Sequence, residues 1–377
     1  MSDPSLWRPW NIDVSSGLAW PETTVPGGPL AFVLHAAELL NHYRPIWRHL
    51  DPSSFEVVIA GEAEQENRHI ADVAEAEGLR VSWIGDVLSE GRVFDAVVSN
   101  HVGAAGVVPT GHALPVLGLR HVRLMYALGK DAWNFAPWNE QYDLILCWGP
   151  YHAGRFEGFS RPRVIQVGYP RLDRIVSMPS SRRDAVVALG GDPDRPTLLW
   201  LPTWSAASSI DAFAETIASL RDHVNVLLKV HPFTALREPD RMAHLASLGL
   251  ASTEDAFVDN VDLIHAADMV AADYGGSAFA TIYADRELVF LNTPGVGGDP
   301  ADAVVGADSL EHRLREWILN IDPGEGGLIL EHLADEAARR QQADVRETLR
   351  RQLFAPFRGC AGEVAATVLR NLSTVLR

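Results

Sequence analysis

The chain has 377 residues, with 32 lysines and arginines against 49 aspartates and glutamates, which gives a formal net charge of −17. This length is typical of two domains, and the acidic balance argues against broad nucleic-acid binding, which needs a basic face. The two cysteines, Cys147 and Cys360, are too few and too far apart for a disulfide framework or a zinc cluster. No apolar run reaches the roughly 18 residues of a membrane-spanning helix. The polar N-terminus lacks a signal-peptide pattern, so we expect a cytoplasmic protein.

The first half of the chain follows a polar arm, residues 1–28, that is rich in proline and glycine. From residue 29 onward, apolar runs of about six residues alternate with helical patterns, which is typical of parallel strands buried on both faces. The helical patterns cover residues 36–50 and 64–78. The predicted strands cover residues 30–35, 56–61, 80–85, 95–100, 121–128 and 143–149.

The second half repeats the alternation. Strands are predicted at 197–202, 224–232, 268–273 and 288–292, with helices at 209–221, 238–248, 260–267 and 277–284. The segment 309–352 reads as helical and charged, with a solvated face that carries Arg339, Arg340, Arg346, Arg350 and Arg351. These patterns predict an α/β protein with two doubly wound, Rossmann-like domains that face a cleft. The predicted domains are residues 29–172 and 173–358, followed by a C-terminal helix, 359–377, that could pack back on the first domain.

A glycine turn links the predicted strand 268–273 to the helix that follows. It reads Asp273-Tyr274-Gly275-Gly276-Ser277. The two glycines could adopt positive φ and let a ligand approach the backbone, and the free N–H groups of a helix beginning near Ser277 favour an anion. The alternative is structural, with Ser277 capping the helix and the glycines making the turn.

Two basic side chains follow the neighbouring strand. Lys229 and His231 are two residues apart, so on a strand they share one side, near its end. Ligands of doubly wound sheets bind beyond the carboxyl ends of the strands. With the glycine turn, Lys229 and His231 would supply the donors that a diphosphate requires.

Several blocks of the chain resemble one enzyme family. "LLWLPTW" (198–204), "LLKVHPF" (227–233) and "LIHAADMVAADYGGSAFATIYADRELVFLNTP" (263–294) occur in this order. They look like the signature blocks of the CDP-glycerol glycerophosphotransferases, the teichoic-acid polymerases and primases. "QVGYPRLDRI" (166–175) and "FRGCAGEVAATVL" (357–369) resemble the family's junction and closing blocks. The resemblance implies a GT-B fold, which agrees with the two Rossmann-like domains.

The resemblance also implies roles for individual residues. His231 would contact the diphosphate or protonate the leaving nucleotide, and Asp273 would orient the turn. Residues 253–258 would frame the base of the nucleotide. Within the three signature blocks, the resemblance implies that the substrate is bound by Thr203, Trp204, Lys229, Gly275, Gly276 and Ser277. It implies the same role for Lys130 and Arg171, which lie outside these three blocks.

The chain departs from the family at the expected catalytic base. The family has a His-Gly pair after a first-domain strand, followed by a lysine, whereas this chain has Tyr126-Ala127 and then Gly129-Lys130. Tyrosine is a poor base unless its pKa is strongly lowered. The candidates for the base are therefore His101 and His35, which each follow a strand, and Asp131, with Tyr126 at the position of the family's histidine.

The resemblance implies a transferase that moves a polyol phosphate, such as glycerol phosphate, from a CDP-activated donor to an acceptor hydroxyl and releases CMP. Its partners would be the nucleotide-activated donor and a glycan or small-molecule acceptor, as in teichoic-acid or capsule biosynthesis, with no nucleic acid. Two alternatives remain: a UDP-sugar glycosyltransferase or epimerase-like enzyme, and an inactive nucleotide-binding protein. We expect no cofactor and no metal, because no Asp-x-Asp pair has a suitable place and His35, His42 and His49 are too widely spaced for metal ligands.

Overall fold

The structure is a computed structural model that describes residues 30–61, 64–101, 117–255, 257–294 and 309–377. The predicted arm, residues 1–28, lies outside these ranges. The described chain divides into two compact units. The C-terminal unit consists of Ala127–Asn134 and Arg174–Gln352, and the N-terminal unit consists of the described residues up to Tyr126, Phe135–Asp173 and Leu353–Arg377. The domain limits expected from the sequence stay a prediction.

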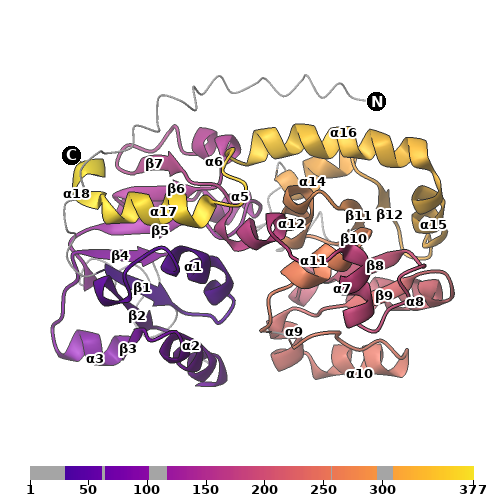
Figure 1. The fold of residues 1–377 in the computed structure, drawn as a ribbon, viewed down its shortest axis with the longest axis horizontal. Coiled ribbons are helices and arrows are strands. Elements are labelled where there is room, and N and C mark those ends of the chain that lie inside the picture. The colour runs from indigo at the N-terminus through magenta and orange to yellow at the C-terminus, as the bar shows by residue number, and fades with distance from the viewer. Residues whose placement is uncertain (1–29, 62–63, 102–116, 256, 295–308) are drawn as a thin grey trace. The chain divides into compact units, whose positions relative to one another are not determined.

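The N-terminal unit is built on a seven-stranded parallel sheet with the order β3-β2-β1-β4-β5-β6-β7 (Figure 1). The central strands are fully buried because their residues are almost all apolar, as expected for strands covered on both faces. The order reverses beside β1, and β1, β4 and β5 are neighbours. The strands are β1 (Leu30–Leu34), β2 (Phe55–Ile59), β3 (Arg80–Trp83), β4 (Ala96–Ser99), β5 (His121–Leu124), β6 (Leu144–Cys147) and β7 (Arg163–Gln166).

The last long helix belongs to the N-terminal unit. Helix α17 (Ala361–Arg370) packs against α1 (Leu39–Trp47). The Asp173 carboxylate accepts hydrogen bonds from the main-chain N–H groups of Ala361, at 3.0 Å, and Gly362, at 2.7 Å. A side chain at Gly362 would lie 2.4 Å from the carbonyl oxygen of Pro45, so only glycine permits this approach. The blocks 166–175 and 357–369 are thus joined by direct contacts.

The C-terminal unit contains a five-stranded parallel sheet with the order β12-β11-β10-β8-β9. Its carboxyl ends include those of three adjacent strands, β10, β8 and β9, which carry the blocks that suggested a phosphate site. The strands are β8 (Thr197–Leu201), β9 (Asn225–Leu228), β10 (Met269–Ala272), β11 (Glu287–Leu291) and β12 (Asn320–Ile321). The helices between them are α8 (Ile210–Ser219), α9 (Pro232–Arg237), α10 (Pro239–Ser247), α11 (Val261–Ala266) and α12 (Ser277–Ala284).

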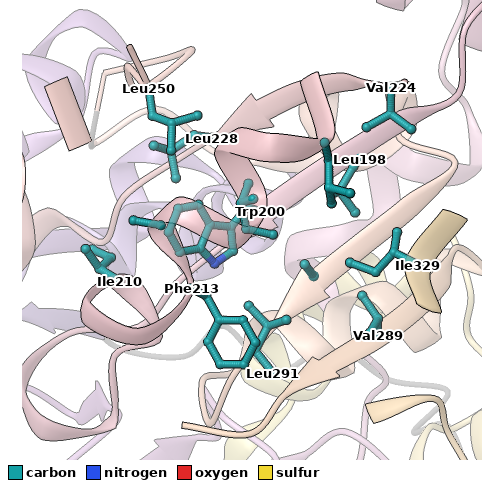
Figure 2. Close-up of a cluster of buried hydrophobic side chains, with 14 of the residues drawn as sticks. Leu198, Trp200, Ile210, Phe213, Val224, Leu228, Leu250, Val289, Leu291 and Ile329 are labelled. Atoms are coloured by element: carbon teal, nitrogen blue, oxygen red, sulfur yellow. The ribbon is translucent and has the colours of Figure 1, made fainter. Parts of the chain in front are cut away.

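The core of the C-terminal unit surrounds Trp200 on β8. Its indole is fully buried, and Figure 2 shows it in the middle of the cluster that includes Phe213, Leu228 and Leu291. The indole N–H donates to the hydroxyl of Ser209 at 3.1 Å, so the one polar atom of this ring has a partner. Burial of large apolar side chains fixes β8 in the centre of the sheet, and with it the residues that follow the strand.

The structure corrects several expectations about local structure. Strand β7 was not predicted, and the segment 309–352 is not wholly helical, because it contains β12 between α14 (Leu310–Arg313) and α15 (Gly327–Ala334). The arginines of α16 (Glu336–Leu353) do not all lie on a solvated face, because Arg346 is buried and its guanidinium pairs with Asp285 at 3.1 Å. No helix in the described ranges combines the length and the apolar character needed to span a membrane.

Candidate functional site

The site in the C-terminal unit is organised around Asp273, which follows β10. Its carboxylate is fully buried and accepts hydrogen bonds from the main-chain N–H of Thr203, at 2.9 Å. It also accepts from the N–H and the hydroxyl of Ser209, both at 2.9 Å. Burial raises the pKa of this carboxyl, and the hydrogen bonds and the guanidinium of Arg315 oppose the rise. Asp273 thus ties the end of β10 to the segment that follows β8, and its position fits the orienting role that the resemblance implies.

The glycine turn lies directly against this segment. A side chain at Gly275 would lie 3.3 Å from the Cβ of Thr203, so the two loops are in close contact. At Gly276, in contrast, a Cβ would meet no atom within 4 Å. The expected positive φ is wrong: Gly276 has φ −67°, and Gly275 is not among the glycines with positive φ. The glycines therefore serve close approach rather than a left-handed turn.

Helix α12 begins at Ser277, and no side chain caps it. The N-cap is Gly276, and the Ser277 hydroxyl lies 3.4 Å from the carbonyl oxygen of Leu201. The structural alternative, in which Ser277 caps the helix, is therefore wrong. The first turn carries no acidic residue, so the positive end of the helix dipole is not neutralised within its own first turn. This end of α12 can hold an anion.

His231 lies after β9 and begins α9. Its Nδ1 accepts a hydrogen bond from the N–H of Phe233 at 3.1 Å. A neutral imidazole that accepts at Nδ1 carries its proton on Nε2, so Nε2 can donate to a ligand oxygen. The ring is stacked with Trp204, at 6.0 Å between centroids, which fixes its orientation. Because Trp204 directly follows Thr203, this segment contacts both His231 and the glycine turn.

Lys229 is buried, with 9% of its surface exposed. Its main-chain N–H donates to the carbonyl oxygen of Trp200 at 3.1 Å, which continues the pairing of β8 with β9 beyond the last residue of the strand. The structure therefore brings Thr203, Lys229, His231 and the turn 273–277 to the carboxyl ends of three adjacent parallel strands.

The N-terminal unit has its own group of polar side chains at the carboxyl ends of β1 and β4. His35 follows β1, and its pKa is lowered mainly by burial, with a further small effect of His101 and an opposing effect of the Glu38 carboxylate. His101, two residues after β4, packs edge-on against Trp138 at 4.9 Å between centroids. A histidine that is neutral at pH 7 can accept a proton, so His35 has the character of a general base.

Tyr126 lies after β5 and contacts His42 edge-on at 5.7 Å. Burial and the Glu38 carboxylate raise its pKa well above the usual value, against the opposing effect of Arg123. Tyr126 is therefore a poorer base than an ordinary tyrosine. Arg171 also lies in this unit, and together with burial its charge holds the pKa of His42 well below the usual value.

Lys130 and Asp131 belong to the C-terminal unit, as part of Ala127–Asn134. The N–H of Lys130 donates to the Glu311 carboxylate at 2.8 Å, and a side chain at Gly129 would overlap that carboxylate. Burial, with a smaller effect of the Asp131 charge, raises the pKa of Glu311 to about 7. Glu311 is 181 residues from Lys130 in the chain, and no local sequence pattern indicated that the two would meet.

No group of three histidine, cysteine or carboxylate side chains in the described ranges is placed to hold a metal ion.

The residues that the sequence analysis singled out belong to two different units. Thr203, Trp204, Lys229, His231, the turn 273–277, Lys130 and Asp131 belong to the C-terminal unit, and His101, Tyr126 and Arg171 belong to the N-terminal unit.

Comparison with solved structures supports the fold. Over 93% of this chain and 89% of the other, the chain is similar to a variant of the wall teichoic acid polymerase TagF soaked with CDPG, with a TM-score of 0.61 and 13% identity. It is also similar to HepE from Anabaena in complex with UDP and glucose, with a TM-score of 0.56, 13% identity, and coverage of 92% and 100%. A third match is a putative UDP-N-acetylglucosamine 2-epimerase from Listeria monocytogenes, with a TM-score of 0.60, 13% identity, and coverage of 93% and 98%. The predicted fold class, two Rossmann-like units of the GT-B type, is confirmed.

Sequence comparison found a family model that matches part of the chain. A search of curated proteins found no match. Residues 139–292 match the family described as CDP-glycerol:poly(glycerophosphate) glycerophosphotransferase. This range contains β8, β9, β10 and the glycine turn, and therefore the whole set of blocks at the carboxyl ends of the second sheet. The resemblance expected from those blocks is confirmed over residues 139–292, which match the model of this family.

Proposed function

We propose that the protein is a transferase that moves a polyol phosphate from a CDP-activated donor to an acceptor hydroxyl and releases CMP. The family match and the GT-B-type fold support a transferase with a nucleotide-activated donor. One observation carries the proposal. Basic side chains and the uncapped N-terminus of α12 gather at adjacent strand ends, where the chain matches the family.

The proposed reaction forms one bond and breaks one. The acceptor oxygen attacks the β-phosphorus of the donor, the bond from that phosphorus to the bridging oxygen breaks, and CMP leaves with the electron pair. Ser277, Gly276 and the first N–H groups of α12 would hold the diphosphate, with Lys229 and Thr203 beside them. Nε2–H of His231 would donate to the departing phosphate. Donors that are held in place stabilise the developing charge without reorganising, which is electrostatic catalysis.

The acceptor must lose a proton during the attack, and we propose His35 or His101 as the base. His35 is the stronger candidate because burial favours its neutral form. We expect the reaction to need no metal or cofactor, and we expect a cytoplasmic location with a glycan or a small molecule as acceptor.

The second candidate function is sugar transfer or epimerisation with a UDP-linked donor. It is favoured by the similarity in fold to HepE, whose structure contains UDP and glucose, and to the putative epimerase. The same pocket would hold the diphosphate, but the attack would fall on the anomeric carbon of the sugar.

Calorimetric titration of the full chain with CDP, CMP, UDP and GDP tests the proposal. We expect CDP to bind most tightly, and Ser277→Ala and His231→Asn to weaken that binding. Asparagine at 231 can still cap α9, so a loss of affinity in this variant is not a loss of the helix. Ser247→Ala, on the exposed part of α10, is the matched control for Ser277→Ala.

The outcomes separate the candidate functions. Preferred binding of UDP would replace the first proposal with the sugar-nucleotide one. Binding of CDP without turnover of CDP-glycerol in the presence of glycerol phosphate, glycerol or a teichoic-acid primer would favour an inactive nucleotide-binding protein. If none of the four nucleotides binds, the proposal is wrong.

A further inference from the structure

A hollow lined by arginines lies at the other edge of the first sheet. It has a volume of about 420 Å³. Arg120 directly precedes β5, Asp143 directly precedes β6, and Arg163 begins β7, so the hollow lies at the amino ends of three adjacent parallel strands. His35, His101 and Tyr126 follow the carboxyl ends of strands in the same sheet. The hollow is therefore separate from the site described above.

The lining is strongly basic, although the whole chain is acidic. Four arginines, Arg120, Arg161, Arg163 and Arg377, line it together with one acidic side chain, that of Asp143. The first three lie at or within two residues of the amino ends of β5 and β7. Three guanidinium groups against one side-chain carboxylate concentrate positive charge on a protein whose formal net charge is −17.

The carboxylates near the hollow already have partners. Asp143 accepts from the Arg161 guanidinium at 2.9 Å and from the N–H of His121 at 2.8 Å. Glu140 accepts from the N–H groups of Ser160, at 2.8 Å, and Arg161, which lines the hollow, at 2.9 Å. These carboxylates are therefore oriented by other groups, and within the described ranges neither forms an ion pair with Arg120 or Arg163.

Two of the arginines have guanidinium N–H groups that could donate to a ligand. The Arg163 guanidinium donates to the carbonyl oxygen of Val375, which orients it but does not neutralise its charge. The half-buried Arg120 guanidinium makes no ion pair and donates no hydrogen bond within the described ranges. A planar guanidinium presents five N–H donors in a fixed geometry that matches two oxygens of a phosphate.

We propose that this hollow binds the phosphate group of a small phosphate ester, with Arg120 and Arg163 as its principal ligands. Its volume lies within the range of small-molecule sites, which is about 300–1,000 Å³. It exceeds the space of a lone phosphate, so a short polyol or sugar attached to the phosphate also fits. A membrane surface is a poorer partner, because it needs a broad apolar and basic face. Among the described residues next to Arg120, the large apolar side chain that is exposed is that of Leu119, with 73% of its surface exposed. One such side chain does not make a broad apolar face.

The test is titration of the full chain with glycerol phosphate, pyrophosphate and inorganic phosphate at low ionic strength. CDP is kept in excess so that the donor pocket cannot account for the signal. We expect Arg120→Gln and Arg163→Gln to lower the affinity for glycerol phosphate at least tenfold. Arg80→Gln is the matched control, because the Arg80 guanidinium also donates to a main-chain carbonyl, that of Ser53, in the same unit. The affinity of Arg80→Gln for glycerol phosphate should equal that of the unaltered chain.

Crystals soaked in selenate give a second, independent readout, because anomalous scattering locates the anion. We expect a peak between Arg120 and Arg163 that disappears in Arg120→Gln. Equal affinity in the unaltered chain and in Arg120→Gln would overturn the proposal, whether or not Arg163→Gln folds normally. Flotation with phosphatidylglycerol vesicles tests the other source of phosphate. Vesicle binding that depends on Arg120, without any binding of the small esters, would also overturn it.

The failure of this proposal and the failure of the proposed function are distinguishable. Loss of CDP binding with an intact arginine hollow would leave the phosphate-ester site in place. Loss of phosphate-ester binding with intact CDP binding would leave the transferase proposal in place.

Discussion

The carboxyl ends of the two sheets present different chemistry. In the C-terminal unit, the groups at this edge are fixed donors: main-chain N–H groups of α12, the buried Lys229 and the Nε2–H of His231. In the N-terminal unit, they are titratable groups whose pKa values burial has changed, such as His35 and Tyr126. Fixed donors suit the recognition of a diphosphate, whereas a neutral, half-buried histidine suits proton transfer. This difference is the reason that we propose donor binding for the C-terminal unit and proton transfer for the N-terminal unit.

The largest effect should come from removing the base that we propose in the N-terminal unit. We expect His35→Gln to lower kcat about 10²–10⁴-fold, because proton transfer by a positioned group contributes about this much. Tyr126→Phe should change kcat little, since the raised pKa of Tyr126 leaves it protonated. Steady-state turnover of CDP-glycerol measures both. A large loss in Tyr126→Phe with a small loss in His35→Gln would reverse the assignment, and His101→Gln shows whether the second histidine carries the role instead.

The next effect should come from His231 in the C-terminal unit. We expect His231→Asn to lower kcat about 10²–10³-fold, the usual consequence of removing one donor to a developing negative charge. Its melting temperature should stay close to that of the unaltered chain, because asparagine can accept the N–H of Phe233 at the start of α9. His231→Ala should lose the same activity and also some stability. Activity that survives in His231→Asn would mean that the histidine is only a cap.

A smaller effect concerns the segment 127–134, which places Lys130 and Asp131 in the C-terminal unit. The folded-state pKa of Glu311, about 7, lies above its ordinary value of 4.5, so folding favours the protonated carboxyl. The stabilisation is fully present below about pH 4.5, and it is lost as the pH rises to about 7. Urea unfolding between pH 5 and pH 8 should therefore show a decline in unfolding free energy that is weaker in Glu311→Gln. The exposed Glu331→Gln should keep the decline of the unaltered chain.

The smallest effect should come from the glycine turn. We expect Gly276→Ala to fold normally, because its φ is ordinary and a Cβ would meet no protein atom. The added methyl group would occupy the approach to the N-terminus of α12, so KM for the donor should rise about tenfold, equivalent to about 1.4 kcal/mol. Gly327→Ala is the control, since a Cβ at that helical position also meets no atom. An unchanged KM would place the diphosphate elsewhere.

Much of the fold could be predicted because the central strands are continuous apolar runs. The expected strands at 30–35 and 95–100 correspond to β1 and β4, whose residues are all buried. Strand β7 was missed because it is a four-residue strand at the edge of the sheet, and none of its residues is fully buried. Strand β12 was missed because its two residues carry no periodic pattern.

The candidate donor site could also be predicted, because its residues lie in short blocks at strand ends. The details of its backbone could not. Gly276 rather than Ser277 is the N-cap of α12, a difference of one residue that only the dihedral angles decide. The contact of Glu311 with Lys130, and the burial of Arg346 against Asp285, depend on segments far apart in the chain. No local pattern could have revealed these pairs.

The bond from Asp173 to the start of α17 has a consequence for the order in which the protein is made. The C-terminal unit ends at Gln352, so all of its residues are synthesised before the last segment of the N-terminal unit. The N-terminal unit lacks the helix that covers α1 until Ala361–Arg370 emerges. The half of the chain that is translated first would therefore be the last to complete its native contacts, and a nascent chain stalled before residue 361 would expose the face of α1 that α17 later covers.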